Sequence, residues 1–155
     1  MTVRWSRALP AAPSSVTVIV DAAARYFASF VVYATPEPLP QIQQAAGIDL
    51  GLTHFAVLSD GRKIGSPRFL RRAEKKLKRA QRALSRKEKG SRNRDKARVT
   101  VARVHARVAD ARREFCHQLS TALIRENQAV AVEDLAVNGL ARTRMAKSVH
   151  DAGWS

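Results

Sequence analysis

The chain has 155 residues, a formal net charge of +15 and a single cysteine, Cys116. A chain of this length buries roughly 70% of its unfolded surface, so it can form a hydrophobic core without covalent cross-links. A single cysteine excludes an internal disulfide and a CxxC zinc site, which favours a reducing cytoplasm and predicts no zinc site in this chain.

The N-terminal region does not resemble a targeting segment. Pro10, Pro13 and Asp21 interrupt the apolar run that a signal peptide would need, and no stretch approaches the length of a membrane span. We therefore expect a cytoplasmic protein without a membrane partner. The sequence gives no indication of the oligomeric state.

The positive charge is concentrated in one block. Residues 62–107 contain 19 Lys and Arg against three acids, a net charge of +16, whereas the rest of the chain carries −1. A block of this kind indicates contact with a polyanion more than general solubility.

Two runs of β-branched and aromatic residues within residues 16–33 flank the segment 21–25, which predicts a β-hairpin. Residues 35–45 follow, where three prolines in five positions exclude a helix or a central strand and indicate a linker. Tyr26, Phe27 and Phe30 are expected to pack in a core, with base stacking as the alternative.

Three short strands are predicted next, at 46–50, 54–58 and 62–64. Asp60-Gly61 lies between the last two, and this pair is typical of a type I′ hairpin turn. The pattern predicts an antiparallel meander.

Two amphipathic helices are predicted within residues 67–126. Ser66 is the expected N-cap of the first helix and Pro67 its first residue. The apolar positions of the first helix are Leu70, Ala73, Leu77, Ala80 and Leu84, and those of the second, from Arg94 to Glu126, are Ala97, Val101, Val104, Val108, Ala111, Phe115, Leu119 and Ala122. These spacings give each helix one apolar face, so the helices are expected to pack as an antiparallel hairpin.

Residues 129–135 (AVAVEDL) follow the helices and predict a short buried strand that ends in acids, with 129–133 as its pairing part. A strand connected to another through a helical crossover is expected to pair with it in parallel, so this strand should lie beside 46–50. The remaining residues predict a loop that enters a further helix.

Asp49 and Glu133 are the candidate catalytic and metal-binding residues. Glycines on both sides of Asp49 leave room for a phosphate, and Glu133 ends the later strand. If the two strands are neighbours, the carboxylates converge as hard oxygen ligands for Mg²⁺ or Mn²⁺ in phosphodiester cleavage. The alternative is that Asp49 caps a turn and Glu133 is an exposed acid at a strand end.

The cations of the first helix are candidate phosphate ligands, because few acids are available there to pair with them. The alternative is a solvated helix face that serves only solubility. The predicted nucleic-acid-binding residues are Arg71, Arg72, Lys75, Lys76, Lys78, Arg79, Arg82 and Arg86.

Three segments resemble the OrfB/TnpB family of transposon proteins. Residues 46–61 (AGIDLGLTHFAVLSDG) resemble its first RuvC motif, and residues 127–140 (NQAVAVEDLAVNGL) resemble its second. Residues 145–154 (MAKSVHDAGW) resemble the stretch that follows. In this resemblance Asp49 and Glu133 correspond to the first two acidic metal ligands.

The resemblance implies an RNase H-like (RuvC-like) α/β fold, with a mixed sheet and a long basic helical hairpin between its third and fourth strands. It also implies an RNA-guided, metal-dependent DNA endonuclease related to type V CRISPR effectors, with DNA and guide RNA as partners. Residues 1–44 would form a β-hairpin remnant of an oligonucleotide-binding barrel with its linker, and residues 45–155 a partial nuclease domain.

The family pattern also includes a third acidic motif and a four-cysteine zinc ribbon, and these 155 residues contain neither. We therefore expect a fragment truncated at both ends that cleaves slowly or not at all by itself. A catalytically inactive nucleic-acid-binding remnant is the alternative. A basic scaffold of ribosomal or nucleoid type would explain the charge but would leave the two acidic motifs without a purpose.

Overall fold

The structure is a computed structural model, and it describes Trp5 and residues 8–152. The chain divides into two compact units, Met1–Leu39 and Pro40–Ser155. The division falls within the proline-rich segment. Each unit is described by itself below.

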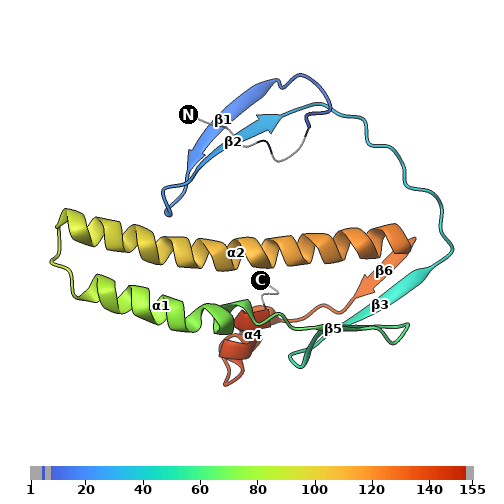
Figure 1. Cartoon of the computed structure of the whole chain (residues 1–155). Coiled ribbons are helices and arrows are strands. Elements are labelled where there is room, and N and C mark those ends of the chain that lie inside the picture. The colour runs from blue at the N-terminus through green and yellow to red at the C-terminus, as the bar shows by residue number, and fades with distance from the viewer. Residues whose placement is uncertain (1–4, 6–7, 153–155) are drawn as a thin grey trace. The chain divides into compact units, whose positions relative to one another are not determined.

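The first unit contains one antiparallel β-hairpin, as predicted. Strand β1 (Ser15–Val20) pairs with β2 (Tyr26–Val31), with Val20 opposite Tyr26 next to the turn. Asp21 organises this turn, because its Oδ1 accepts hydrogen bonds from the backbone N–H groups of Ala23 and Arg25, both at 2.9 Å. Figure 1 shows the two strands as the paired arrows labelled β1 and β2.

The second unit contains a mixed four-stranded sheet in the order β5-β4-β3-β6. Its strands are β3 (Ala45–Leu50), β4 (His54–Leu58), β5 (Lys63–Gly65) and β6 (Ala129–Val132). The first three form the predicted antiparallel meander. β6 pairs with β3 in parallel after the helical crossover, which confirms that prediction. The predicted burial of this strand is wrong, because β6 is at the edge of the sheet and all four of its residues are exposed.

The turn between β4 and β5 differs from the predicted type I′ turn. Of Asp60 and Gly61, only Gly61 has a positive φ, at 88°, whereas a type I′ turn needs two such residues. The N–H of Gly61 donates to the carbonyl of Leu58, and the N–H of Leu58 donates to the carbonyl of Arg62. This is the pattern of a longer loop that ends in a left-handed residue, and glycine takes that place without steric cost.

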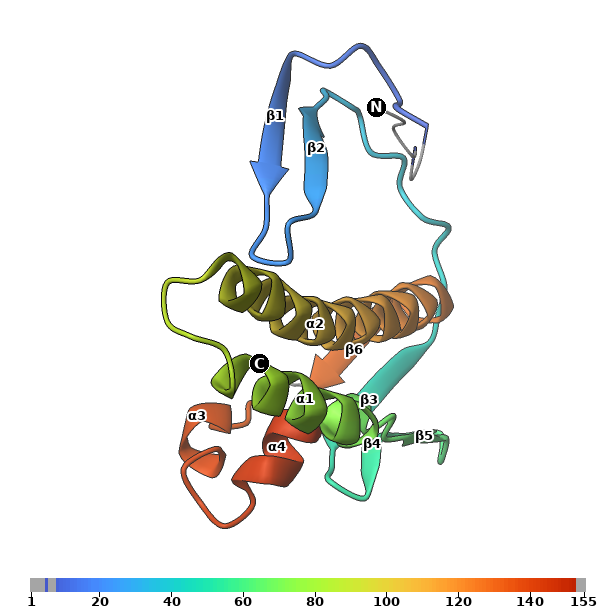
Figure 2. The same ribbon diagram turned by 60° about the vertical axis from the view of Figure 1, so that its left-hand side comes forward.

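Two helices form the connection between β5 and β6. Helix α1 (Phe69–Ser85) and helix α2 (Arg92–Glu126) pack side by side along their apolar faces (Figures 1 and 2). α2 starts at the predicted break in the chain, where the Oγ of Ser91 accepts a hydrogen bond from the N–H of Arg94. None of the helices among the described residues combines the length and apolar composition needed to cross a bilayer.

The predicted cap of α1 is wrong. Ser66 and Pro67 precede the helix, and the N-cap is Arg68, which has a φ of 48° and no side-chain capping bond. The chain turns at Arg68 after leaving β5. The first N–H groups of α1 therefore depend on a partner from elsewhere in the chain.

The C-terminal part of α2 covers the sheet. Leu123 is 7% exposed and packs with Ala46 and Leu58, while Phe115 makes edge-to-face contacts with Phe55 and Phe69. Ala122, predicted in this apolar face, is exposed. Leu123 takes that place, because the apolar face drifts around a long helix and contact with the sheet decides which neighbour is buried.

Two short helices follow β6: α3 (Val137–Leu140) and α4 (Ala146–Ala152). α4 packs against α1 (Figure 2) and buries Val149 and Ala152. The last two residues of the third matching segment, Gly153 and Trp154, lie outside the described residues.

Candidate functional site

The parallel pairing of β3 and β6 places Asp49 next to Glu133. The register pairs Ala45 with Ala129 and continues to Ile48 with Val132, so Asp49 and Glu133 are the next residues along each strand. The N–H of Glu133 donates to the carbonyl of Ile48 at 3.4 Å. The backbones of Asp49 and Glu133 thus lie side by side at the same end of the two strands.

Both carboxylates are available to a ligand. Asp49 and Glu133 are exposed, and neither side chain has a hydrogen bond or ion pair within the described part of the chain. The arrangement offers hard oxygen atoms to a cation.

The two glycines beside Asp49 have local roles. The N–H of Gly47 donates to the Oγ of Ser59 at 3.0 Å. A Cβ at Gly51 would lie 3.2 Å from the carbonyl oxygen of His54, which is tighter than ordinary van der Waals contact. Gly51 thus lets the chain turn closely from β3 into β4, directly after Asp49.

The donor set suits one divalent ion, with most of its coordination left to other ligands. Mg²⁺ takes six oxygen ligands and commonly binds proteins through one or two carboxylates, keeping several waters. No group of three or more His, Cys, Asp or Glu suited to a metal occurs among residues 5 and 8–152. β6 ends at Val132, so strand alternation does not determine the direction of Asp134.

The basic residues of α1 form a second candidate site. Six of the eight predicted residues have no ion pair or hydrogen bond from their side chains within the described chain. At 3.6 residues per turn, these six fall within about 120° of the helix circumference and extend over about 21 Å. They are Arg72, Lys75, Lys76, Arg79, Arg82 and Arg86, and we call them the α1 stripe.

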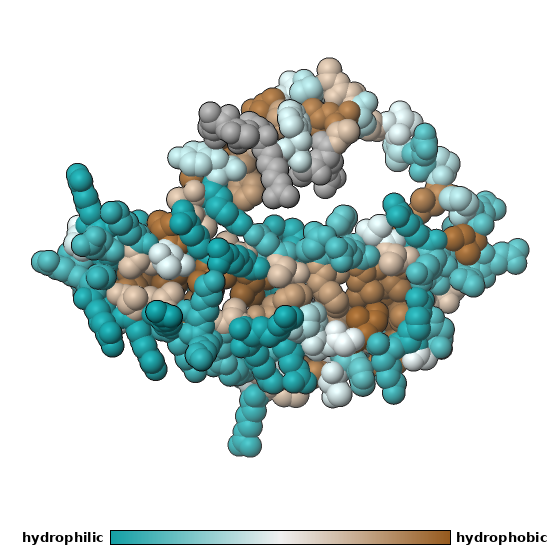
Figure 3. All heavy atoms as spheres, viewed as in Figure 1, coloured by the Kyte–Doolittle hydropathy of each residue, from teal (hydrophilic) through white to brown (hydrophobic). Residues whose placement is uncertain are grey.

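The other two predicted residues have partners inside the chain. Lys78 pairs with Glu74 at 2.9 Å, and the Nε of Arg71 lies 3.2 Å from the Oδ2 of Asp151. The hydrogen bond from Lys78 is the largest cause that lowers the pKa of Glu74 below its ordinary value. Hydrophilic side chains project along the helical hairpin in Figure 3.

The cations of α2 are more often neutralised or used structurally. Arg98 pairs with Asp95 and Arg113 with Asp110, each at 3.6 Å. Arg94 donates to the backbone carbonyls of Leu84 and Lys87, at the end of α1. Unpaired positive charge is therefore densest on α1.

Asp151 is a polar residue that the sequence patterns did not indicate. Its Oδ1 accepts hydrogen bonds from the backbone N–H groups of Leu70 and Arg71, at the start of α1. The two partners are about 80 residues away in the chain, so no local spacing marks them. An uncapped helix start at Arg68 would have been the only signal, and the sequence places Ser66 there as a plausible cap.

The aromatic residues of β2 are not buried in a core. Tyr26 is 63% exposed and Phe27 is 46% exposed, so the predicted core packing is wrong for both. The guanidinium of Arg25 lies over the Phe27 ring, 5.1 Å from its centroid. Phe30 stacks on Trp5 at a centroid distance of 5.5 Å.

The fold and these two sites define an α/β protein with an acidic pair at the ends of parallel strands and a basic helix connecting them. The family model OrfB_IS605, described as "Probable transposase", matches residues 15–144. The chain therefore belongs to the OrfB_IS605 transposase family. That match includes both segments that carry Asp49 and Glu133.

Two curated relatives align along nearly the whole chain. One is a "Putative RNA-guided DNA endonuclease" of Streptomyces pristinaespiralis, 49% identical over all of this chain and 39% of its own length. Another is the "Putative RNA-guided DNA endonuclease InsQ" of Escherichia coli K12, 28% identical over 99% of this chain and 42% of its own length. The chain thus spans about two fifths of each of these relatives.

Proposed function

We propose that this chain forms part of an RNA-guided, metal-dependent DNA endonuclease, with a nuclease domain of the RNase H-like, RuvC type. The observation that carries the proposal is the β3–β6 pairing, whose register ends with Ile48 opposite Val132 and is followed by the hydrogen bond from the N–H of Glu133 to the carbonyl of Ile48, directly before Asp49. The descriptions of the two relatives support DNA cleavage guided by RNA. Because the chain spans 39% and 42% of those relatives, the activity of the whole protein belongs to the proposal.

Mg²⁺ or Mn²⁺ is the cofactor that we propose for this pair. Asp49 and Glu133 would hold it, leaving further coordination positions to water and phosphate oxygens. When bound, such an ion acts as a Lewis acid that stabilises negative charge on a phosphoryl group. The contribution of the chain is to bring the backbones of Asp49 and Glu133 side by side at the ends of two neighbouring strands.

The α1 stripe would bind the phosphate backbone of RNA or DNA. Six cations without partners on one helix face favour a polyanion, and contacts to phosphate are independent of base sequence. The hairpin of β1 and β2 would belong to an oligonucleotide-binding barrel, whose exposed Tyr26 and Phe27 suit base stacking. Such a protein would act in the cytoplasm, where its nucleic acids are.

A second candidate function is nucleic-acid binding without cleavage. The number of acidic residues at the site favours this function. The described residues bring only two candidate carboxylates, Asp49 and Glu133, together at the end of the sheet. Cleavage that stabilises both the entering and the leaving oxygen ordinarily uses two ions and therefore more ligands. We propose that the 155 residues alone bind the ion weakly and cleave DNA slowly or not at all.

The metal site can be tested without activity. Mn²⁺ is paramagnetic, so titrating it into the labelled chain should broaden the NMR signals around Asp49 and Glu133 first. Asp49→Asn and Glu133→Gln should each abolish this selective broadening. Asp134→Asn is the matched control, since it removes a neighbouring exposed carboxylate that the register does not place beside Asp49.

Cleavage is tested by a nuclease assay with guide RNA and Mg²⁺, run beside Asp49→Ala and Glu133→Ala. Selective Mn²⁺ broadening with little cleavage supports the metal site and the need for further ligands. Robust cleavage that both substitutions abolish supports the site and contradicts the weak-activity proposal. Broadening that persists in both variants would overturn the metal site.

A further inference from the structure

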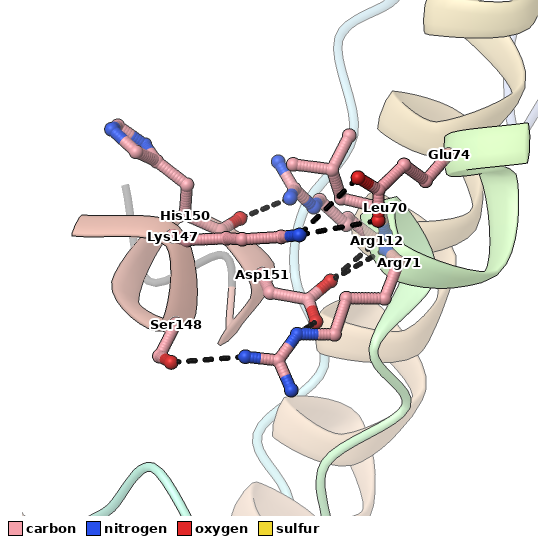
Figure 4. A network of polar contacts seen from close by, with 8 residues as sticks. All are labelled: Leu70, Arg71, Glu74, Arg112, Lys147, Ser148, His150 and Asp151. Carbon is pink, nitrogen blue, oxygen red and sulfur yellow. Dashed lines mark hydrogen bonds and ion pairs between the residues drawn. The ribbon is translucent and has the colours of Figure 1, made fainter. Parts of the chain in front are cut away.

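Asp151 is the buried charge of the described chain, with 3% of the residue exposed. Its Oδ1 accepts the N–H of Leu70 at 3.0 Å and that of Arg71 at 3.2 Å, and its Oδ2 lies 3.2 Å from the Nε of Arg71 (Figure 4). A buried carboxylate is costly unless it is paired and hydrogen-bonded. Oδ1 is hydrogen-bonded and Oδ2 is held by the ion pair with Arg71, without a hydrogen bond among the described residues, so these contacts fix Asp151 and the two groups that it touches.

The first of these groups is the start of α1. The N-cap Arg68 offers no side-chain bond, and the first turn contains no acid. Asp151 supplies, from α4, both the acceptor that caps helix N–H groups and the negative charge that a helix N-terminus favours. α1 is thus capped by a residue about 80 positions later in the chain.

The second group is the guanidinium of Arg71. Besides the ion pair with Asp151, its NH2 group donates to the Oγ of Ser148 at 3.2 Å. The neighbouring contacts strengthen the docking of α4, since Lys147 pairs with Glu74 at 3.2 Å and Arg112 donates to the carbonyl of His150. The Arg71 side chain is 42% exposed, and two of its nitrogens, Nε and Nη2, are directed at Asp151 and Ser148 of α4 (Figure 4).

We infer that Asp151 is a positioning residue that withholds Arg71 from the phosphate-contacting surface of α1. The phosphate-contacting surface is then the α1 stripe, while Arg71 serves to dock α4. A phosphate that bound the Nε and Nη2 of Arg71 would have to replace Ser148 and a buried carboxylate that also caps the helix. This inference rests on the proposed binding of polyanions by α1.

The test is the salt dependence of binding to a short DNA duplex of arbitrary sequence, measured with the full chain. Each phosphate contact contributes about 0.9 to the slope of log affinity against log salt. Arg79→Gln removes a cation of the α1 stripe and should make the slope shallower by about that amount. Arg71→Gln removes the same charge from the same helix and should leave the slope unchanged.

Asp151→Asn separates two roles of this side chain, because it keeps a capping oxygen for α1 and removes the negative charge that pairs with Arg71. Asparagine caps helices as well as aspartate, so the amide oxygen keeps the contacts with α1. The amide nitrogen would face the Arg71 guanidinium and release it. Arg71 could then contact a phosphate, so the slope should become steeper by up to about 0.9. In the double variant Asp151→Asn/Arg71→Gln, which keeps the net charge of the chain, the slope should return to its original value.

Glu88→Gln is the control for a general effect of lost negative charge, because Glu88 lies in the exposed turn between α1 and α2. Circular dichroism shows whether each variant keeps its helices. If Arg71→Gln makes the slope as much shallower as Arg79→Gln does, the inference is overturned. This comparison does not depend on whether Asp151→Asn folds. A slope unaffected by Arg79→Gln would instead contradict the proposed function of the α1 stripe.

Discussion

The β1–β2 hairpin of the first unit and the β4–β5 hairpin of the second have turns held by the same kind of aspartate contacts. They differ in what covers their strands. In the first, Oδ2 of Asp21 pairs with the Nε of Arg25 at 2.7 Å, and Oδ1 accepts the Arg25 backbone N–H. In the second, Oδ2 of Asp60 pairs with the Nε of Arg62 at 2.6 Å, and Oδ1 accepts the Arg62 N–H. One carboxylate thus fixes each turn through backbone and side chain together.

The strands themselves have opposite surroundings. Val18 is 69% exposed in β1, whereas Leu58 is 4% exposed in β4. The difference comes from α2, whose Leu119 and Leu123 cover the second hairpin. A local turn can define a hairpin, but an isolated two-stranded hairpin is marginally stable, and burial depends on a distant segment.

The largest expected effect is from removing that cover. Leu123→Ala should lower the free energy of unfolding of the second unit by about 2–5 kcal/mol, because it leaves a cavity between α2 and the sheet. Urea denaturation followed by far-UV circular dichroism measures it, since α1 and α2 both lie in this unit.

Ile124→Ala is the matched control, because Ile124 is adjacent in α2 and 56% exposed. Its expected cost is within about 0.5 kcal/mol, as for most surface substitutions. Equal losses for the two variants would mean that α2 does not cover the sheet through Leu123.

The next effect compares the two turns directly. The left-handed position is Ala24 in the first hairpin, with a φ of 57°, and Gly61 in the second, with a φ of 88°. A non-glycine residue in this conformation costs roughly 1–2 kcal/mol. Ala24→Gly should therefore stabilise its hairpin by up to about 1 kcal/mol, and Gly61→Ala should destabilise the second unit by about 1 kcal/mol.

Amide exchange in β1 and β2 measures the first change, and urea denaturation measures the second. Gly65→Ala is the control for Gly61, because its φ is outside the left-handed region and a Cβ there meets nothing within 4 Å. Changes of the same sign at Ala24 and Gly61 would contradict the assigned turn conformations.

The elements that the sequence predicted are those determined by local patterns and by connection rules. The pattern of short strands and a turn in residues 46–64 and the helical period from Leu70 to Leu84 place strands and helices within a few residues of their observed bounds. The crossover rule then predicts the parallel neighbours β3 and β6, and with them the adjacent positions of Asp49 and Glu133.

The features that escaped prediction depend on tertiary contacts. Asp151 caps a helix that begins about 80 residues earlier, and nothing in its neighbourhood indicates that partner. Leu123, rather than Ala122, is buried because the sheet contacts that side of α2. Tyr26 and Phe27 are residue types common in cores, yet the described residues of the first unit form only the β1–β2 sheet and leave both side chains exposed.

The smallest expected effect concerns pH and sharpens the comparison of the turns. The pKa of Asp21 and that of Asp60 both lie below the ordinary value of 3.8, and the largest cause in each is a hydrogen bond from a backbone N–H, of Arg25 and of Arg62 respectively. A carboxylate whose pKa is lower in the folded state stabilises the fold above about pH 3.8. That contribution is lost as the pH falls through the lowered folded pKa.

NMR titration of the carboxyl carbons measures both pKa values in one sample. Arg62→Gln keeps the backbone N–H and removes the guanidinium, so the pKa of Asp60 should rise only part of the way to its ordinary value. The pKa of Asp21, in the other unit, should not change. Arg62 also pairs with Glu126 of α2 at 2.8 Å. The same substitution therefore tests whether this ion pair helps to hold α2 against the β4–β5 hairpin. A complete return of the Asp60 pKa would show that the guanidinium, and not the turn backbone, holds the carboxylate charged, and the two turns would then not share one device.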